Sequence, residues 1–222
     1  MSICELENKL FAEWQGKRKG FVKDGVVSED DYLSSKPKIA LILKEVNSKD
    51  DGWNLIDFVR EGARPQTWNN VARWVHGIRN RESMQNWSYY SDSKMTNEFR
   101  TDMLKSICII NLKKSPGTHT TDNATLDKVA KEDKEFIQRQ FKIYEPDLTI
   151  CGGTGGLFKE VLGFGSLELK QTKRGIQYFN PEQNKYVVCF AHPEARIQDS
   201  LLHYGLLDAI NEIYTDPLSD LL

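Results

Sequence analysis

The chain has 222 residues, of which 39% are hydrophobic and 28% are charged, and its formal net charge is −2. These values are typical of a globular domain and exclude a disordered chain. The nearly balanced charge also excludes a global field that would attract a polyanion, so nucleic-acid binding would need a local basic patch. The first ten residues have no apolar core and no apolar stretch is long enough to span a bilayer, so we expect no signal peptide and no membrane partner.

The cysteines indicate the redox compartment. None of Cys4, Cys108, Cys151 and Cys189 belongs to a CxxC pair, and the last three lie within or at the end of apolar runs. Such cysteines are typical of free, buried thiols. We therefore predict no disulfide, no metal site, no cofactor and a reducing, cytoplasmic location.

The first recognisable strand is a continuous apolar run over residues 38–43, directly after Pro37. A run of this kind is typical of a strand that is buried on both faces. We treat the residues before it, about 1–36, as an N-terminal extension. A polar loop covers 44–52, and apolar residues at helical spacing then predict a helix over 67–75.

The remaining elements follow in chain order. The sequence predicts a loop over 80–92, a helix over 95–105, a strand over 107–112, a long helix over 126–144, a strand over 147–151, a glycine-rich turn over 152–156, and a helix that ends near 162. The long helix should end before Pro146, because proline disfavours helical backbone in the residue before it. We expect a hairpin over 175–190, with a central strand at 186–190, and a terminal helix over 200–214.

Buried strands that alternate with helices predict an α/β fold. We expect three layers, αβα, around a mostly parallel four-stranded central sheet, in a single domain that spans residues 1–222. Ligands bind beyond the carboxyl ends of the strands in such sheets. The loops that leave the four strands begin at Lys44, Asn111, Gly152 and Ala191, and we expect them to meet at one site.

These loops would bring a carboxylate, an amide, an imidazole and several lysines to one cleft. Glu45 can orient or deprotonate water, or oppose a positive charge that develops on a sugar. His192 can donate a hydrogen bond to a departing anion, and Asn111 can both donate to and accept from the edge of a base. Hydrolysis of an ester or a phosphoryl bond fits the same set of side chains.

Four segments, in this order, resemble the iron–sulfur (family 4) branch of the uracil-DNA glycosylase superfamily. "KIALILKEVN" is similar to the family's first strand and loop, "DFVREG" to the segment that follows, "ICIINLKKSPG…DKEFIQRQFKIYEPDLTICGG" to its central part, and "VVCFAHPEAR" to its closing His-Pro-Ser motif. The resemblance spans about residues 38–205. It implies an enzyme that removes uracil or another damaged base from DNA by cleaving the N-glycosidic bond.

The resemblance also implies roles for individual residues. Glu45 would act on water, His192 would stabilise the departing base, Asn111 would recognise the base edge, Phe58 would stack on the flipped base, and Asn47 would contact the substrate. A flipped nucleotide costs a few kcal/mol of unstacking, part of which stacking on an aromatic ring returns.

DNA, either single-stranded or damaged, would be the partner, and Lys113, Lys114 and Arg196 would contact its phosphates. The sequence leaves the oligomeric state open. It departs from the family in the first loop, which lacks the family's proline and glycines, and at Glu194, which replaces the serine of His-Pro-Ser. The cysteine ligands of the family's cluster are absent, so we expect no cluster.

Other interpretations remain open. Glu45 and His192 can be structural residues at strand ends, Asn111 can form a turn through its own backbone, and Phe58 can belong to the core. At the level of the whole protein, one alternative is a nucleoside-binding, base-binding or other small-molecule enzyme on the same fold. A catalytically degenerate protein that binds nucleic acid is another.

Overall fold

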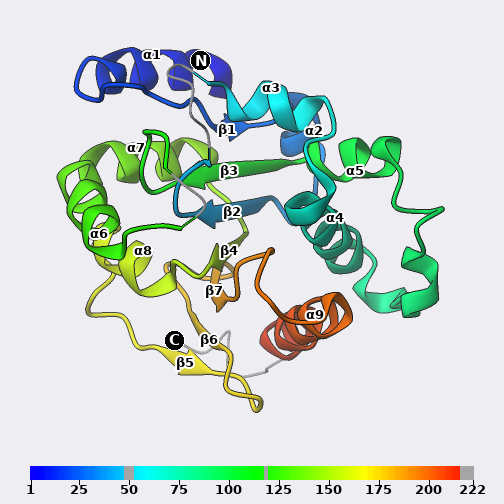
Figure 1. The fold of residues 1–222 in the computed structure, drawn as a ribbon. Helices are drawn as coiled ribbons and strands as arrows, with labels where there is room; N and C mark the ends of the chain where they lie inside the picture. Colours follow the sequence, from blue (N-terminus) through cyan, green and yellow to red (C-terminus); the bar gives the residue numbers. More distant parts are fainter. Residues whose placement is uncertain (48–52, 118–119, 216–222) are drawn as a thin grey trace.

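The computed structural model describes residues 1–47, 53–117 and 120–215. Its centre is a mixed sheet with the strand order β1-β3-β2-β4-β7-β6-β5 (Figure 1). The strands are β1 (Gly25–Val26), β2 (Ile39–Leu43), β3 (Ile107–Asn111), β4 (Leu148–Gly152), β5 (Lys170–Gln171), β6 (Gln177–Phe179) and β7 (Tyr186–Phe190). The predicted α/β class is confirmed.

The prediction of a four-stranded sheet is wrong, because seven strands pair in the part of the chain that the structure describes. The inner strands β3, β2, β4 and β7 are parallel, as expected, whereas β1 pairs antiparallel with β3 and the β5–β6 hairpin extends the other edge antiparallel to β7. The additional strands are only two or three residues long. Segments this short carry too few alternating residues to give a recognisable strand pattern.

Helices cover both faces of the sheet (Figure 1). They are α1 (Ile3–Gln15), α2 (Glu29–Ser34), α3 (Leu55–Arg60), α4 (Pro65–Arg79), α5 (Asn97–Leu104), α6 (Asn123–Glu132), α7 (Lys134–Tyr144), α8 (Gly155–Val161) and α9 (Asp199–Thr215), with 3₁₀ turns η1 (Arg81–Ser83) and η2 (Trp87–Tyr90) between α4 and α5. No helix in these described ranges is long and apolar enough to cross a membrane.

The core has two halves, one on each face of the sheet. In β2, Ile39, Leu41 and Leu43 pack with residues of α3, α4 and α9, while Ala40 and Ile42 pack with residues of α1, α7 and α8. Successive strand residues point to opposite faces, so a strand buried on both sides is apolar throughout. The arrangement is a three-layer αβα sandwich.

The N-terminal segment is part of this sandwich rather than an appendage. Helix α1 starts with a capping box between Ser2 and Glu5 and packs on α7, and β1 pairs with β3. Trp14 of α1 and Tyr32 of α2 have no exposed surface. Residues 1–36 therefore complete one half of the core.

The single long helix predicted over 126–144 is wrong in one respect, because it is divided into α6 and α7 at Asp133. Asp133 has the backbone angles φ −94° and ψ 6°, and its buried carboxylate accepts a hydrogen bond from Arg18 Nε at 2.7 Å. This contact with a distant part of the chain stabilises the break, which helical periodicity does not reveal.

The four cysteines are free thiols. Cys108 and Cys151 are buried, Cys189 is half-buried and Cys4 is exposed. Within the described residues, no group of three His, Cys, Asp or Glu side chains is arranged to hold a metal ion.

Candidate functional site

The topology of the sheet favours a ligand site at the carboxyl ends of β2 and β4. The chain leaves β2 towards α3 and α4 on one face of the sheet, and leaves β4 towards α8 on the other face. Adjacent parallel strands whose connections diverge in this way form the usual ligand crevice of an open α/β sheet. The sequence placed the site at this edge.

The loops predicted to meet are in contact. Leu112 N donates to Leu43 O at 3.0 Å, which joins the β3 and β2 loops, and Thr154 Oγ1 donates to Ile42 O at 3.0 Å, which joins the β4 loop to β2. Gly153 N donates to Phe190 O at 2.8 Å and connects β4 with β7. All four loops therefore lie along one edge.

Glu45 lies just after β2 and its side chain is only 5% exposed. Its carboxylate forms an ion pair with Lys113 Nζ, which also donates to Pro116 O at 3.2 Å. A Cβ atom added to Gly117 would lie 2.1 Å from the Glu45 carboxyl carbon. The absence of a side chain at Gly117 is what leaves room for this carboxylate.

A pocket of about 250 Å³ opens beside Glu45. The described residues that line it are Glu45, Lys113, Pro116, Gly117, Thr120, Asp122 and Thr125. This lining contains two acidic groups and one basic group, together with two hydroxyls. It is therefore a polar pocket with a slight excess of negative charge, and His192, Asn111 and Phe58 are not among these described lining residues.

His192 lies after β7 and is half-buried. Its Nδ1 accepts a hydrogen bond from Glu194 N at 3.1 Å, so in the neutral ring the proton is on Nε2. Burial lowers the pKa of His192, and Lys44 and Arg64 lower it further, whereas Glu194 opposes the shift. The ring is therefore neutral near pH 7, with Nε2–H as its donor.

β4 and the glycine that follows it, Gly153, lie between the strands that precede Glu45 and His192. β4 lies between β2 and β7, so the two backbones are separated by two strand spacings, about 10 Å. At the end of β4, Gly153 is exposed and adopts φ 70°, and the nearest atom to an added Cβ would be Lys44 Cε at 4.0 Å. Glu45 and His192 thus follow strands on either side of β4, and the Glu45 side chain turns towards Lys113 and Gly117 after β3.

Phe58 is half-buried on α3, and its ring centroid lies 5.1 Å from that of Trp53. Both rings pack against the core, so the core interpretation of Phe58 holds in part, while the remaining exposure leaves ring surface for a ligand. Asn47 is exposed and forms an isolated parallel bridge with Gly117. It therefore lies beside the pocket of Glu45.

The structure encloses Asn111 and Lys114, away from the positions that their predicted roles need. Asn111 is 1% exposed, and its Nδ2 points to the Asp24 carboxylate at 3.3 Å. Lys114 has no exposed surface, and its Nζ lies 2.7 and 2.5 Å from the two Asp24 oxygens. Because both side chains are enclosed, neither a base edge nor a DNA phosphate can reach them in this conformation.

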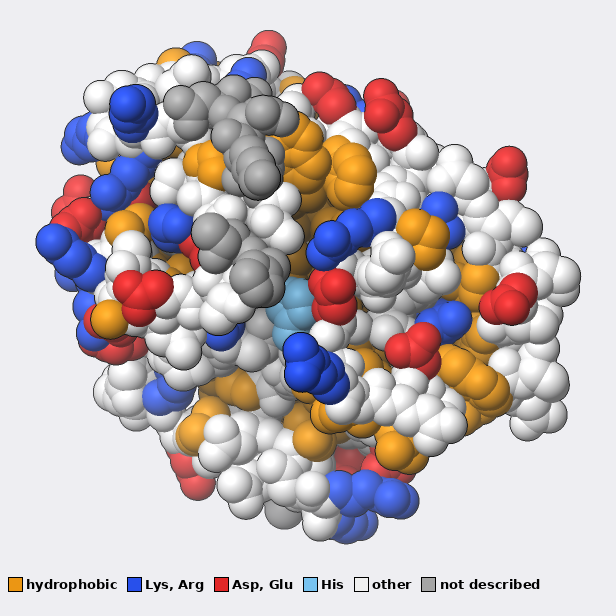
Figure 2. All heavy atoms as spheres, in the orientation of Figure 1, with side chains coloured by type: hydrophobic (Ala, Val, Ile, Leu, Met, Phe, Trp, Pro, Cys, Tyr) orange, Lys and Arg blue, Asp and Glu red, His pale blue; other side chains and the backbone are white. Residues whose placement is uncertain are grey.

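The two other predicted phosphate contacts differ from each other. Lys113 is 13% exposed and is engaged with Glu45, whereas Arg196 is exposed. Glu194, the unfavourable charge near the site, accepts hydrogen bonds from Arg64 Nη2 at 3.0 Å and Thr67 Oγ1 at 2.9 Å. Figure 2 shows acidic and basic side chains interleaved over the visible face rather than a continuous basic patch.

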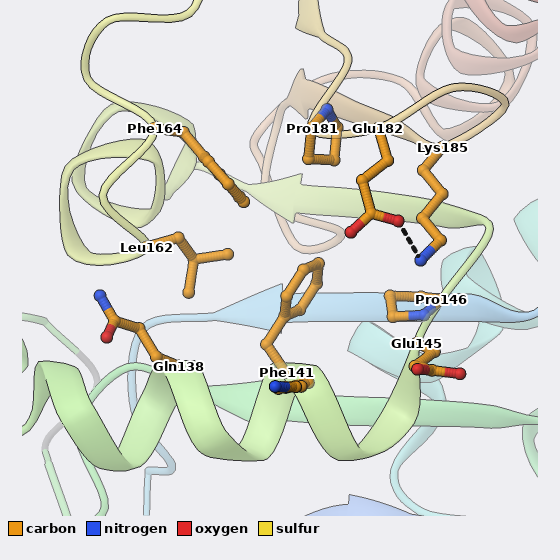
Figure 3. A pocket seen from close by; sticks show the side chains of 10 residues that line it. Gln138, Phe141, Glu145, Pro146, Leu162, Phe164, Pro181, Glu182 and Lys185 are labelled. Carbon is orange, nitrogen blue, oxygen red and sulfur yellow. Dashed lines mark ion pairs between the residues drawn. The ribbon is translucent and has the colours of Figure 1, made fainter.

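A larger cavity of about 370 Å³ lies at the opposite edge of the sheet, beside the residues that precede β4 and β7 (Figure 3). Phe141, Leu162 and Phe164 point into it, and Glu182 and Lys185 pair across its rim at 2.7 Å. None of the predicted site residues is among the described residues that line it. Its pair of Glu182 and Lys185 is engaged internally and it holds none of the predicted residues, so we do not place the chemistry there.

No protein-family model matches the chain, and no curated protein sequence matches it.

Sequence reasoning missed four residues that shape this edge. Lys44 contributes to the electrostatics of His192, Trp53 pairs with Phe58, Gly153 is exposed at the end of β4, and Asp24 holds Asn111 and Lys114. Lys44 and Gly153 directly follow predicted strands, and this position was a usable signal. Asp24 lies within the N-terminal segment, where no pattern pointed to the site.

Proposed function

We propose that this protein hydrolyses an N-glycosidic bond, with uracil or another damaged base in DNA as the substrate class that the sequence resemblance implies. The observation that carries the proposal is the position of Glu45 and a neutral His192 at the same edge of the sheet, after strands that flank β4. The strands that precede the two residues lie about 10 Å apart, a separation comparable to the size of a nucleoside.

The chemistry assigns a different role to each side chain. Glu45 orients a water molecule and takes its proton as the water oxygen bonds to C1′, and its negative charge opposes the oxocarbenium character of the sugar. The C1′–N bond breaks and its electron pair leaves with the base. His192 Nε2–H donates a hydrogen bond to the anionic base, and the neutral ring that burial favours keeps this donor because Nδ1 accepts from Glu194 N.

Binding would use the aromatic pair and the first loop. The exposed part of the Phe58–Trp53 pair offers a stacking surface, and Asn47 offers an amide beside the pocket of Glu45. Stacking on an aromatic ring is worth about 1–3 kcal/mol per base. This is comparable to the cost of extruding a nucleotide from a duplex.

A second candidate is a nucleoside hydrolase on the same fold. The observations that favour it are the complete burial of Lys114, the pairing of Lys113 with Glu45, and the excess of carboxylates around the pocket. A phosphodiester would be repelled by such a pocket, whereas the hydroxyl groups of a free nucleoside would bind to it.

The test is base release from uracil-containing single- and double-stranded oligonucleotides and from a panel of free nucleosides. We expect Glu45→Gln to lower kcat by about 10²–10⁴-fold and His192→Ala by about 10²–10³-fold. The exposed Glu82→Gln is the matched control and should retain full activity.

The choice of substrate separates the two candidates. Release from oligonucleotides supports the glycosylase, and release from nucleosides alone supports the second candidate. If the wild-type protein releases no base from either, or if both variants keep full activity, the hydrolase proposal is refuted.

A further inference from the structure

Two neighbouring lysines after β3 have opposite environments. Lys113 turns towards the pocket and contacts Glu45, while Lys114 turns into the protein and has no exposed surface. Successive residues of an extended chain point to opposite sides, so fixing one of them directs the other.

The buried lysine is held by Asp24, whose side chain also has no exposed surface. Besides Lys114, Asp24 accepts hydrogen bonds from Asn111 N at 2.7 Å and from Gln140 Nε2 at 2.8 Å. Val22 N donates to Lys114 O at 2.7 Å. The N-terminal segment therefore forms hydrogen bonds with the chain on both sides of Lys113.

Burying this ion pair costs free energy, because both charges lose contact with water. Burial lowers the pKa of Lys114, and Asp24 opposes that shift, while the ammonium lies 4.9 Å from the centre of the Trp14 ring. An apolar pair of similar volume is often at least as stable as a buried ion pair. A role in placing neighbouring atoms accounts for the pair better than a contribution to stability does.

We propose that Asp24 and Lys114 are positioning residues that hold the Lys113 ammonium against the Glu45 carboxylate. This inference rests on the proposed function, because it assigns to the N-terminal segment the task of placing the charge beside the reacting carboxylate. Glu45 then keeps one fixed orientation towards the pocket, since its cationic partner cannot move with the loop.

The test uses NMR signals of lysine side-chain ammonium groups in the full chain, which persist only where hydrogen bonds slow the exchange of their protons with water. We expect one such signal to be absent from the spectrum of Lys113→Met and another from that of Lys114→Met, which assigns the two signals. In Asp24→Asn/Lys114→Met, where the buried charges are removed together, the Lys113 signal should disappear at temperatures well below unfolding. If this variant does not fold, Asp24→Asn/Lys114→Gln retains hydrogen-bonding groups and takes its place.

The matched control is Glu13→Gln/Arg139→Met, which removes an exposed ion pair of 2.6 Å and should leave the Lys113 signal unchanged. A Lys113 signal that persists after neutralisation of Asp24 and Lys114 overturns the inference. The outcome is separate from that of the hydrolase proposal. An inactive wild-type protein whose Lys113 signal depends on Asp24 refutes the proposed activity alone, and an active protein whose signal does not depend on it refutes the positioning role alone.

Discussion

At the scale of single residues, the least expected feature is the buried glutamate Glu7 of α1. Burial raises its pKa from 4.5 to about 7, the negative charge of Asp24 adds to this, and hydrogen bonds from Tyr144 and Val26 oppose it. Its Oε1 accepts from Val26 N at 2.9 Å. The folded protein therefore holds this proton at pH values where the unfolded chain has released it.

This shift makes stability depend on pH. The stabilisation that this pKa shift provides is fully present below pH 4.5. It decreases as pH rises through 7 and is absent at higher pH, because the folded state binds more protons than the unfolded state only between these values. From pH 5 to pH 8, we expect the free energy of unfolding to fall by about 2–3 kcal/mol more in the wild type than in Glu7→Gln. The glutamine keeps an oxygen acceptor for Val26 N. Urea unfolding at both pH values measures this, and parallel losses in the two proteins would contradict it.

Individual side chains also show how much of the candidate site could be predicted from the sequence. Glu45 and His192 directly follow central strands, so their place at the carboxyl edge follows from strand order alone. Asn111 ends β3 and Lys114 lies three residues after it, yet their side chains point to Asp24. Only the tertiary partner, 87 or 90 residues away in sequence, determines that orientation.

At the scale of elements, the contact between α4 and α9 depends on a glycine. A Cβ atom on Gly77 would lie 2.7 Å from Leu207 Cδ1 and 2.9 Å from His203 Cε1, and His203 is fully buried. Both distances are shorter than real Cβ contacts allow. The two helices can therefore approach this closely only because Gly77 has no side chain.

We expect Gly77→Ala to destabilise the protein by about 1–2 kcal/mol, because a strain of about 1–3 kcal/mol exceeds the gain of about 1 kcal/mol in helix propensity. Gly156 of α8 is the matched control, since a Cβ there would meet no atom within 4 Å. Gly156→Ala should stabilise by up to about 1 kcal/mol. Thermal unfolding compares the two variants, and a stabilised Gly77→Ala would show that the helices can separate without cost.

Element by element, length and continuity decided which predictions succeeded. The apolar runs of β2, β3, β4 and β7 identified the four parallel strands. The edge strands β1 and β5 have two residues each, too few for a pattern. The break between α6 and α7 depends on Arg18 reaching Asp133 from 115 positions away in the chain, so local periodicity does not predict it.

At the scale of the whole molecule, charge limits how the protein can bind DNA. The net charge is −2, Lys114 is enclosed, and Lys113 is paired with Glu45. Arg196 is the predicted phosphate contact that stays exposed. With about one phosphate neutralised, affinity should fall only about threefold to fourfold between 50 and 200 mM salt.

Fluorescence anisotropy with single- and double-stranded oligonucleotides at both salt concentrations measures this dependence. Arg196→Ala should weaken binding and make the salt dependence shallower, and the exposed Arg174→Ala, whose side chain is 76% exposed, provides the matched control. A thousandfold loss of affinity over this salt range would mean that many more cations contact the phosphates.

The sequence by itself determined the α/β class, the four central strands and the edge of the sheet where their loops meet. These features follow from local hydrophobic continuity and from the rule that parallel strands share a carboxyl edge. Only the tertiary structure decided the edge strands, the part that residues 1–36 play in the core, and which polar side chains face the pocket. Those outcomes depend on the distant partners of Asp24 and Asp133. The pattern of neighbouring residues does not predict the energy of such long-range contacts.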